Sequence, residues 1–157
     1  MVRRVFGYVL ITILFFFIII LSVFKPIKVQ GNSMYPNLKD GEWALINKFT
    51  YSITDPKRGD LIIFKLPKYD SEYMIKRVIG LQYESVKIVS GIIYINGNRL
   101  NEIYNPSFFQ YNFYKRIIPQ NHIFVLGDNR KFSIDSRYED VGFIDKKYII
   151  GKIIFKW

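Results

Sequence analysis

One apolar run dominates the sequence and limits what the chain can fold into. Residues 5–24 read VFGYVLITILFFFIIILSVF, twenty consecutive residues without a charged side chain. As a helix, about 20 apolar residues cross a hydrocarbon core roughly 30 Å thick. Phe, Ile and Leu would cover every face of that helix, which leaves no polar side for solvent and disfavours a soluble core helix. We therefore predict a transmembrane helix over residues 5–24.

A cleavable signal peptide is the competing interpretation, because Arg3 and Arg4 form a basic start. Such peptides carry an apolar core of about 7 to 15 residues followed by a small-x-small cleavage site. The run here is longer, and the residues that follow it read KPIKVQ. Arg3 and Arg4 precede the run and Lys25, Lys28 and Lys39 follow it, so charge leaves the orientation open, but long domains cross the membrane largely regardless of charge. We expect a short cytoplasmic tail over residues 1–4 and an extracytoplasmic domain over residues 25–157.

The amino-acid composition limits the catalytic groups and the partners that the chain can have. The chain has no cysteine, which excludes thiol nucleophiles and thiolate metal sites. A net charge of +10 indicates an anionic partner, for which nucleic acid and anionic lipid headgroups both qualify. The predicted anchor favours lipid, and no nucleic acid is expected. The basic residues are spread from Lys25 to Lys156 without a dense tract, so a solvated surface also accounts for the charge.

Beyond residue 28 the pattern predicts a mainly β domain. Short β-branched or alternating runs are separated by turn residues, and no long amphipathic helix is visible. Asn96-Gly97, between apolar residues, favours a two-residue hairpin turn. The predicted strands lie in the segments EWALINKF, DLIIFKL, YMIKRVIGL, VKIVSGIIYINGNRL, HIFVLGD and YIIGKIIFKW.

The stretch NPSFFQYNFYKR, residues 105–116, concentrates aromatic side chains in otherwise polar surroundings. One interpretation is core packing within an irregular loop. The other is a loop that places its rings in the lipid headgroup layer, where Trp and Tyr settle.

Three segments could carry chemistry. Ser33 lies between Gly31 and Pro36, which suits a fixed nucleophile but also an ordinary turn. A serine needs a base within hydrogen-bond reach. His122 is the only histidine, and a triad of Ser33, His122 and Asp128 is formally possible.

Lys76 is the other candidate base, because it interrupts the apolar strand segment EYMIKRVIGL. Removal from water lowers the pKa of a lysine and lets it act as a neutral base. A lysine that extends its amine to solvent along an apolar stem is the alternative. The third segment, GDNRKFSIDSR over residues 127–137, is rich in hydroxyl and charged groups, which is typical of a polar network or of a surface loop.

Taken in order, GNSMYPNL, RGDLIIF, YMIKRVIGL and GDNRKFSIDSR resemble the motif blocks of bacterial type I signal peptidases, also called leader peptidases. Weaker blocks, GEWALINKFTY and YINGNRL, extend the resemblance over nearly all of the chain after the apolar run. It implies a signal-peptidase-like β-sheet catalytic domain behind one transmembrane helix. It also implies a membrane-anchored serine endopeptidase that cleaves signal peptides from exported preproteins and uses no metal or organic cofactor.

The resemblance also implies roles for individual residues. Ser33 would be the nucleophile and Lys76 the general base, while Ser133 would hydrogen-bond Lys76 and hold its amine toward Ser33. Gly127 would allow a close backbone approach. The remaining matched residues would be scaffold, with the pairing of acids and bases left open: Arg77, Asp128, Asp135 and Arg137.

The sequence departs from the family pattern in places. Gly31 stands where some members carry a serine that adds an oxyanion donor, and Asn37 stands where threonine is usual. Neither departure removes a catalytic residue. Three other interpretations stay open: a specialised peptidase that matures one dedicated substrate such as a pilin or conjugation protein, a catalytically weak accessory paralogue, and a membrane-tethered nucleic-acid binder.

Overall fold

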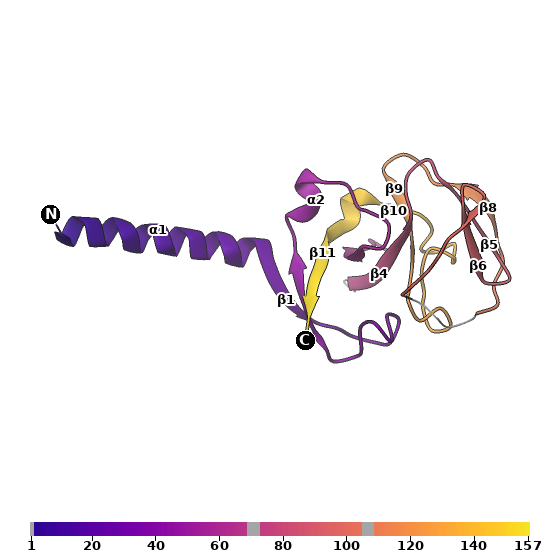
Figure 1. The fold of residues 1–157 in the computed structure, drawn as a ribbon, viewed down its shortest axis with the longest axis horizontal. Coiled ribbons are helices and arrows are strands. Elements are labelled where there is room, and N and C mark those ends of the chain that lie inside the picture. The colour runs from indigo at the N-terminus through magenta and orange to yellow at the C-terminus, as the bar shows by residue number, and fades with distance from the viewer. Residues whose placement is uncertain (1, 69–72, 105–108) are drawn as a thin grey trace.

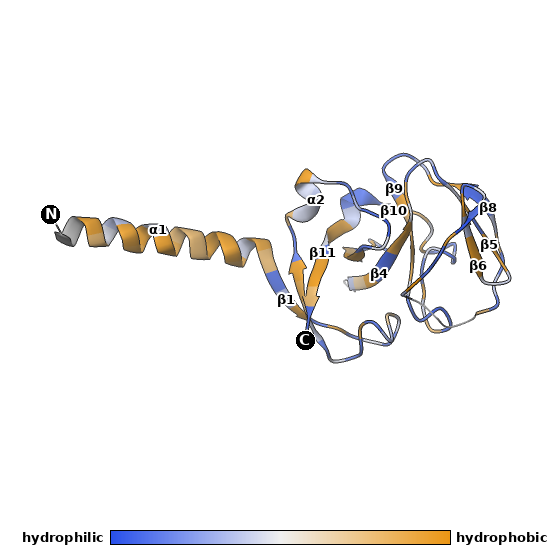
Figure 2. Cartoon of the chain, viewed as in Figure 1, coloured by the Kyte–Doolittle hydropathy of each residue, from blue (hydrophilic) through white to orange (hydrophobic). Residues whose placement is uncertain are grey.

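The protein consists of one long helix and a β-domain (Figure 1). A computed structural model describes residues 2–68, 73–104 and 109–157. Helix α1 (Val2–Val23) projects away from the domain, and its segment Val5–Val23 is long and apolar enough to cross a membrane. None of that segment is covered by the rest of the chain, and it is apolar along nearly its whole length (Figure 2). The helix ends at Val23, and Phe24 already belongs to the first strand.

The domain is mainly β, as the sequence predicts. A short helix α2 (Thr50–Ile53) and a 3-10 turn η1 (Lys146–Tyr148) interrupt the strands. In chain order the strands are β1 (Phe24–Lys28), β2 (Trp43–Asn47), β3 (Leu61–Lys65), β4 (Tyr73–Gly80), β5 (Ser85–Val89), β6 (Ile92–Ile95), β7 (Asn98–Arg99), β8 (Phe113–Ile117), β9 (His122–Leu126), β10 (Ile144–Asp145) and β11 (Ile149–Lys156).

The larger sheet positions the residues of interest. Its strand order is β1-β2-β11-β3-β4-β9-β10, and all neighbours are antiparallel. Strand β4 pairs along its length with β3, with Lys76 opposite Ile62. Strand β9 pairs only with the later part of β4, from Arg77 onward. Residues 73–76 therefore have one backbone edge that no described strand occupies.

The smaller sheet, in the order β7-β6-β5-β8, lies at the end of the domain away from α1 (Figure 1). The predicted hairpin joins β6 to β7, with Ile95 paired to Asn98. Asn96 and Gly97 both have positive φ, at 52° and 84°. These are the backbone angles that a two-residue turn of this kind needs, so the Asn-Gly prediction is confirmed.

The aromatic stretch belongs to the core of this distal end. Phe109 and Phe113 are buried, and the Phe113 ring lies 5.2 Å from that of Phe124. Core packing is thus confirmed for these two rings, and insertion into lipid headgroups is wrong for them. Tyr114 is 89% exposed. Phe108 lies outside the described residues.

Each predicted strand segment contains at least one strand, but the sequence pattern does not predict β1, β8 or β10. Strand β1 contains Pro26 and begins at the last residue of the apolar run, so its local pattern is weak. It forms because β2 pairs with it over its whole length, from Phe24 opposite Asn47 to Lys28 opposite Trp43. Long-range pairing here overrides local propensity.

Candidate active site

Ser33 lies in a turn, residues 31–38, that follows strand β1. Gly31 adopts a φ of 79°, a left-handed conformation that suits glycine, and its N–H donates to Asp40 Oδ1 at 2.7 Å. Met34 and Leu38 are buried and anchor the turn in the core. The Asn129 N–H donates to the Ser33 carbonyl at 3.0 Å. The turn is therefore fixed both by apolar packing in the core and by a hydrogen bond from the 127–137 segment.

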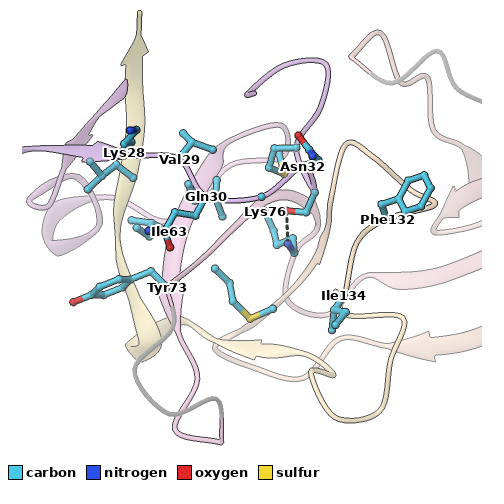
Figure 3. Close-up of a pocket in the computed structure, with 15 residues that line it drawn as sticks. Lys28, Val29, Gln30, Asn32, Ile63, Tyr73, Lys76, Phe132 and Ile134 are labelled. Carbon is cyan, nitrogen blue, oxygen red and sulfur yellow. Dashed lines mark hydrogen bonds between the residues drawn. The ribbon is translucent and has the colours of Figure 1, made fainter. Parts of the chain in front are cut away.

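Lys76 reaches this turn from strand β4. Its side chain is only 4% exposed, and its Nζ lies 2.8 Å from Ser33 Oγ, within hydrogen-bond distance (Figure 3). Burial lowers the pKa of the Lys76 amine from 10.5 to about 8, although the Asp135 carboxylate opposes that change. A lysine of this kind is partly neutral near neutral pH and can accept a proton.

Ser133 lies beside Gly127, close to the Ser33 carbonyl, and its side chain makes no hydrogen bond to any described residue. Its Oγ is buried and has no partner among the described residues, so the predicted bond to Lys76 is not formed in this structure. Gly127 packs directly against it. A Cβ on Gly127 would lie 2.1 Å from Ser133 Oγ and 2.6 Å from the Ser33 carbonyl oxygen, which only glycine avoids.

The scaffold residues form two buried ion pairs, which the sequence could not assign. Arg77 Nε donates to Asp128 Oδ1 at 2.7 Å, and its Nη2 donates to Oδ2 at 2.5 Å. Arg137 Nε donates to Asp135 Oδ1 at 2.7 Å. Asp135 also accepts the Gly127 N–H at 3.0 Å. All four charged side chains are nearly inaccessible to solvent, so each depends on its ion-pair partner to compensate its charge.

Sequence reasoning missed several residues around this frame. Arg130 pairs with Glu102 and donates through Nε to the Gly127 carbonyl at 2.9 Å. Asn129 Nδ2 donates to the Asn32 carbonyl at 3.0 Å, and Asn37 Nδ2 donates to Asp128 Oδ2 at 2.9 Å. The only signal in the sequence was the polar density of residues 127–137 and the unusual asparagine at position 37.

His122 is not part of the site. It begins strand β9, opposite Asp145 of β10, and its Nδ1 lies 2.7 Å from the Gln120 carbonyl. Gly127 follows the other end of the same strand, roughly 16 Å away at about 3.3 Å per residue. The triad of Ser33, His122 and Asp128 is therefore not assembled.

Ser33 and Lys76 lie in an open cleft of about 780 Å³ (Figure 3). Residues 27–34 and residues 73–76 contribute to its lining. Ile63 and Ile75 are opposite each other in β3 and β4 and give the cleft apolar walls. Phe132 and Ile134 of the 127–137 segment also line it.

A hydroxyl beside a buried amine of lowered pKa, in a cleft open to solvent, is the arrangement that serine hydrolases with a lysine base require. The fold and the site are thus those of a hydrolase built on a β-sheet. Comparison with known proteins gives the family. The family model described as signal peptidase, peptidase S26, matches residues 2–157.

Individual relatives agree with this family. The chain is 35% identical to signal peptidase I of Bacillus caldolyticus over 151 residues, which cover 87% of this chain and 81% of the relative. It is 33% identical to signal peptidase I P of Bacillus subtilis subsp. natto, with coverage of 91% and 82%. The crystal structure of a signal peptidase I from Enterococcus faecalis V583 superposes with a TM-score of 0.56 at 32% identity, covering 65% of this chain and 99% of that one. The chain belongs to the peptidase S26 family of signal peptidases.

Proposed function

We propose that the chain is a membrane-anchored serine endopeptidase that removes N-terminal signal peptides from exported preproteins, with Ser33 as nucleophile and Lys76 as general base. The single observation that carries this proposal is the 2.8 Å contact between Ser33 Oγ and the buried Lys76 Nζ. Family membership supports the substrate class. In this proposal residues 1–4 are cytoplasmic, residues 5–24 span the membrane and residues 25–157 are extracytoplasmic.

The chemistry follows from the geometry of the pair. Neutral Lys76 takes the proton of Ser33 Oγ as the oxygen attacks the scissile carbonyl, and it then protonates the leaving amine. A water molecule, deprotonated by the same amine, then attacks the acyl carbonyl, and the Ser33 Oγ leaves with the proton that the lysine returns to it. The Ser33 N–H has no partner among the described residues, so it is free to donate to the oxyanion. In the proposal, Ser133, whose buried Oγ has no partner among the described residues, hydrogen-bonds the Lys76 amine once its hydroxyl turns toward it.

The cleft suits an extended peptide. Residues 73–76 have an unused backbone edge, and strand β1 pairs only with β2 among the described strands. A substrate strand can add to such edges through main-chain hydrogen bonds. The first and third residues before the cut would then point to the same side, against the walls formed by Ile63 and Ile75. Small side chains at these two positions fit that wall, as the family resemblance implies.

The membrane lipid is the second partner of the proposal. A signal peptide held in the bilayer presents its cleavage site just outside the apolar core, near the end of α1. Anionic headgroups would attract the basic domain, whose chain carries a net charge of +10.

The test is cleavage of a preprotein in detergent micelles by the wild type and by Ser33→Ala, Lys76→Ala and His122→Ala. We expect the first two variants to lose processing, by about 10⁴-fold or more, because each removes a member of one catalytic unit. The histidine variant should retain it. If His122→Ala fails together with Ser33→Ala while Lys76→Ala cleaves, the lysine base is wrong.

A further inference from the structure

Asn37 belongs to the same turn as Ser33, but its side chain contacts two other segments. Its Nδ2 donates to Asp128 Oδ2 at 2.9 Å and to the Tyr104 carbonyl at 2.7 Å. A primary amide has two N–H donors, so both are used. Lys156 Nζ hydrogen-bonds the Asn37 carbonyl. This residue thus ties the turn to three separate parts of the chain.

Both hydrogen-bond partners of the Asn37 side chain, Asp128 and Tyr104, contact the residue next to Lys76 in strand β4. Asp128 is fully buried and makes a two-point contact with Arg77, the residue after Lys76 in strand β4. The Arg77 guanidinium also lies 4.2 Å from the centre of the Tyr104 ring. Because both residues contact Arg77, a movement of Asp128 or Tyr104 relative to the Ser33 turn would also move strand β4. Lys76 would then change its position relative to Ser33.

At the other end of the turn, Asn129 holds the Ser33 carbonyl. Without the Asn37 side chain, residues 35–38 lose their described hydrogen bonds to Asp128 and to the Tyr104 carbonyl. The burial of Leu38 then still holds this part of the turn. A threonine at this place has one hydroxyl donor instead of two. It could satisfy Asp128 or the Tyr104 carbonyl, but not both.

We propose that Asn37 is a positioning residue that holds the Ser33 turn in register with the strand carrying Lys76, through its two hydrogen bonds to Asp128 and the Tyr104 carbonyl. This rests on the proposed function of the Ser33–Lys76 pair. Asn37 touches neither reacting group, so its effect passes through the distance between them.

The experiment compares the full-length wild type, Asn37→Ala and Asn37→Thr in detergent micelles, with Asn98→Ala as the matched control. Asn98 is an exposed residue of the distal hairpin. We expect Asn37→Ala to lower kcat per folded molecule by roughly 10- to 100-fold with KM nearly unchanged, because small misplacements of reacting groups cost about that much. Asn37→Thr should recover part of the loss, and the control should match the wild type.

A second readout does not depend on cleavage: the NMR titration of isotope-labelled Lys76. In the wild type burial holds the pKa of Lys76 at about 8. In Asn37→Ala the loosened turn should admit water and raise that pKa toward the ordinary value for lysine. Asn98→Ala should leave it unchanged.

The outcomes separate the two proposals. If Asn37→Ala only lowers the folded fraction, with kcat per folded molecule and the Lys76 titration as in the wild type, the positioning role is wrong. If the wild type cleaves no preprotein, the proposed function fails, and the Lys76 titration alone decides whether Asn37 sets the position of the lysine.

Discussion

At the scale of single residues, the ionisation of Lys76 decides whether the site can work. A charged ammonium cannot take a proton from Ser33. Burial in the cleft wall removes the hydration that stabilises the charged form, and the pKa of Lys76 falls to about 8. Asp135 opposes this change but is itself engaged by Arg137, which weakens its pull on the lysine.

The pH dependence of cleavage follows from that pKa. Because the neutral amine is the active form in the proposed mechanism, kcat/KM should rise with pH and reach half of its plateau near pH 8. The measurement is kcat/KM for a preprotein or a signal-peptide substrate across the neutral and alkaline range. A half-maximal rate near pH 6.5, about the ordinary pKa of histidine, would contradict the assignment of Lys76 as base.

At the scale of elements, the junction of β4 with the segment after β9 fixes the geometry of the site. Lys76 and Arg77 are neighbours in β4, so their side chains leave opposite faces of the strand. Lys76 reaches Ser33, and Arg77 holds Asp128, which follows the end of β9. One strand thus presents the proposed base on one face and the structural ion pair on the other.

Removing one member of that ion pair should be costly. We expect Arg77→Met to lower the free energy of unfolding by about 3–5 kcal/mol, because Asp128 would remain buried without its cation. The double variant Arg77→Met/Asp128→Leu should lose less than the sum of the two single variants. Urea unfolding followed by circular dichroism at neutral pH measures all three.

The surface pair of exposed Lys147 and partly buried Asp145 provides the control for this cycle. Lys147→Met should change the free energy of unfolding by less than about 1 kcal/mol, as is usual for surface pairs. Strict additivity of Arg77→Met and Asp128→Leu would mean that the buried pair is not the coupled unit described here.

At the scale of the whole molecule, α1 and the β-domain are separate structural parts joined by β1. Ser33 lies ten positions after Val23, the last residue of α1, and the extended chain spans at most about 3.6 Å per residue. Ser33 therefore cannot lie more than roughly 36 Å from the end of the apolar helix. As the proposed membrane anchor, α1 would confine the search for membrane-held substrates to two dimensions and raise their effective concentration.

A chain shortened to residues 24–157 tests this role. The Val5–Val23 segment is not covered by the domain, so its removal should leave the β-sheet circular dichroism spectrum intact. Cleavage of a soluble signal-peptide substrate should stay within about two-fold of the full chain, whereas a preprotein in vesicles should be processed at least about 10-fold more slowly. Equal rates on both substrates would show that α1 does not contribute to encounter.

The sequence by itself determined the local features. Twenty uncharged residues define the apolar helix, β-branched runs define most strands, and Asn96-Gly97 defines one hairpin. These signals are local because period and turn geometry depend on neighbouring residues. The resemblance of short motif blocks also named the candidate residues, including Ser33 and Lys76.

Only the tertiary structure decided how those residues meet. Ser33 and Lys76 are 43 positions apart, and Arg77 and Asp128 are 51 apart. Such contacts depend on strand pairing and on which groups lose water together, and no local pattern encodes either. The same reason explains why the partner of each buried acid, the unpaired Ser133 hydroxyl and the two hydrogen bonds of Asn37 became visible only in the folded chain.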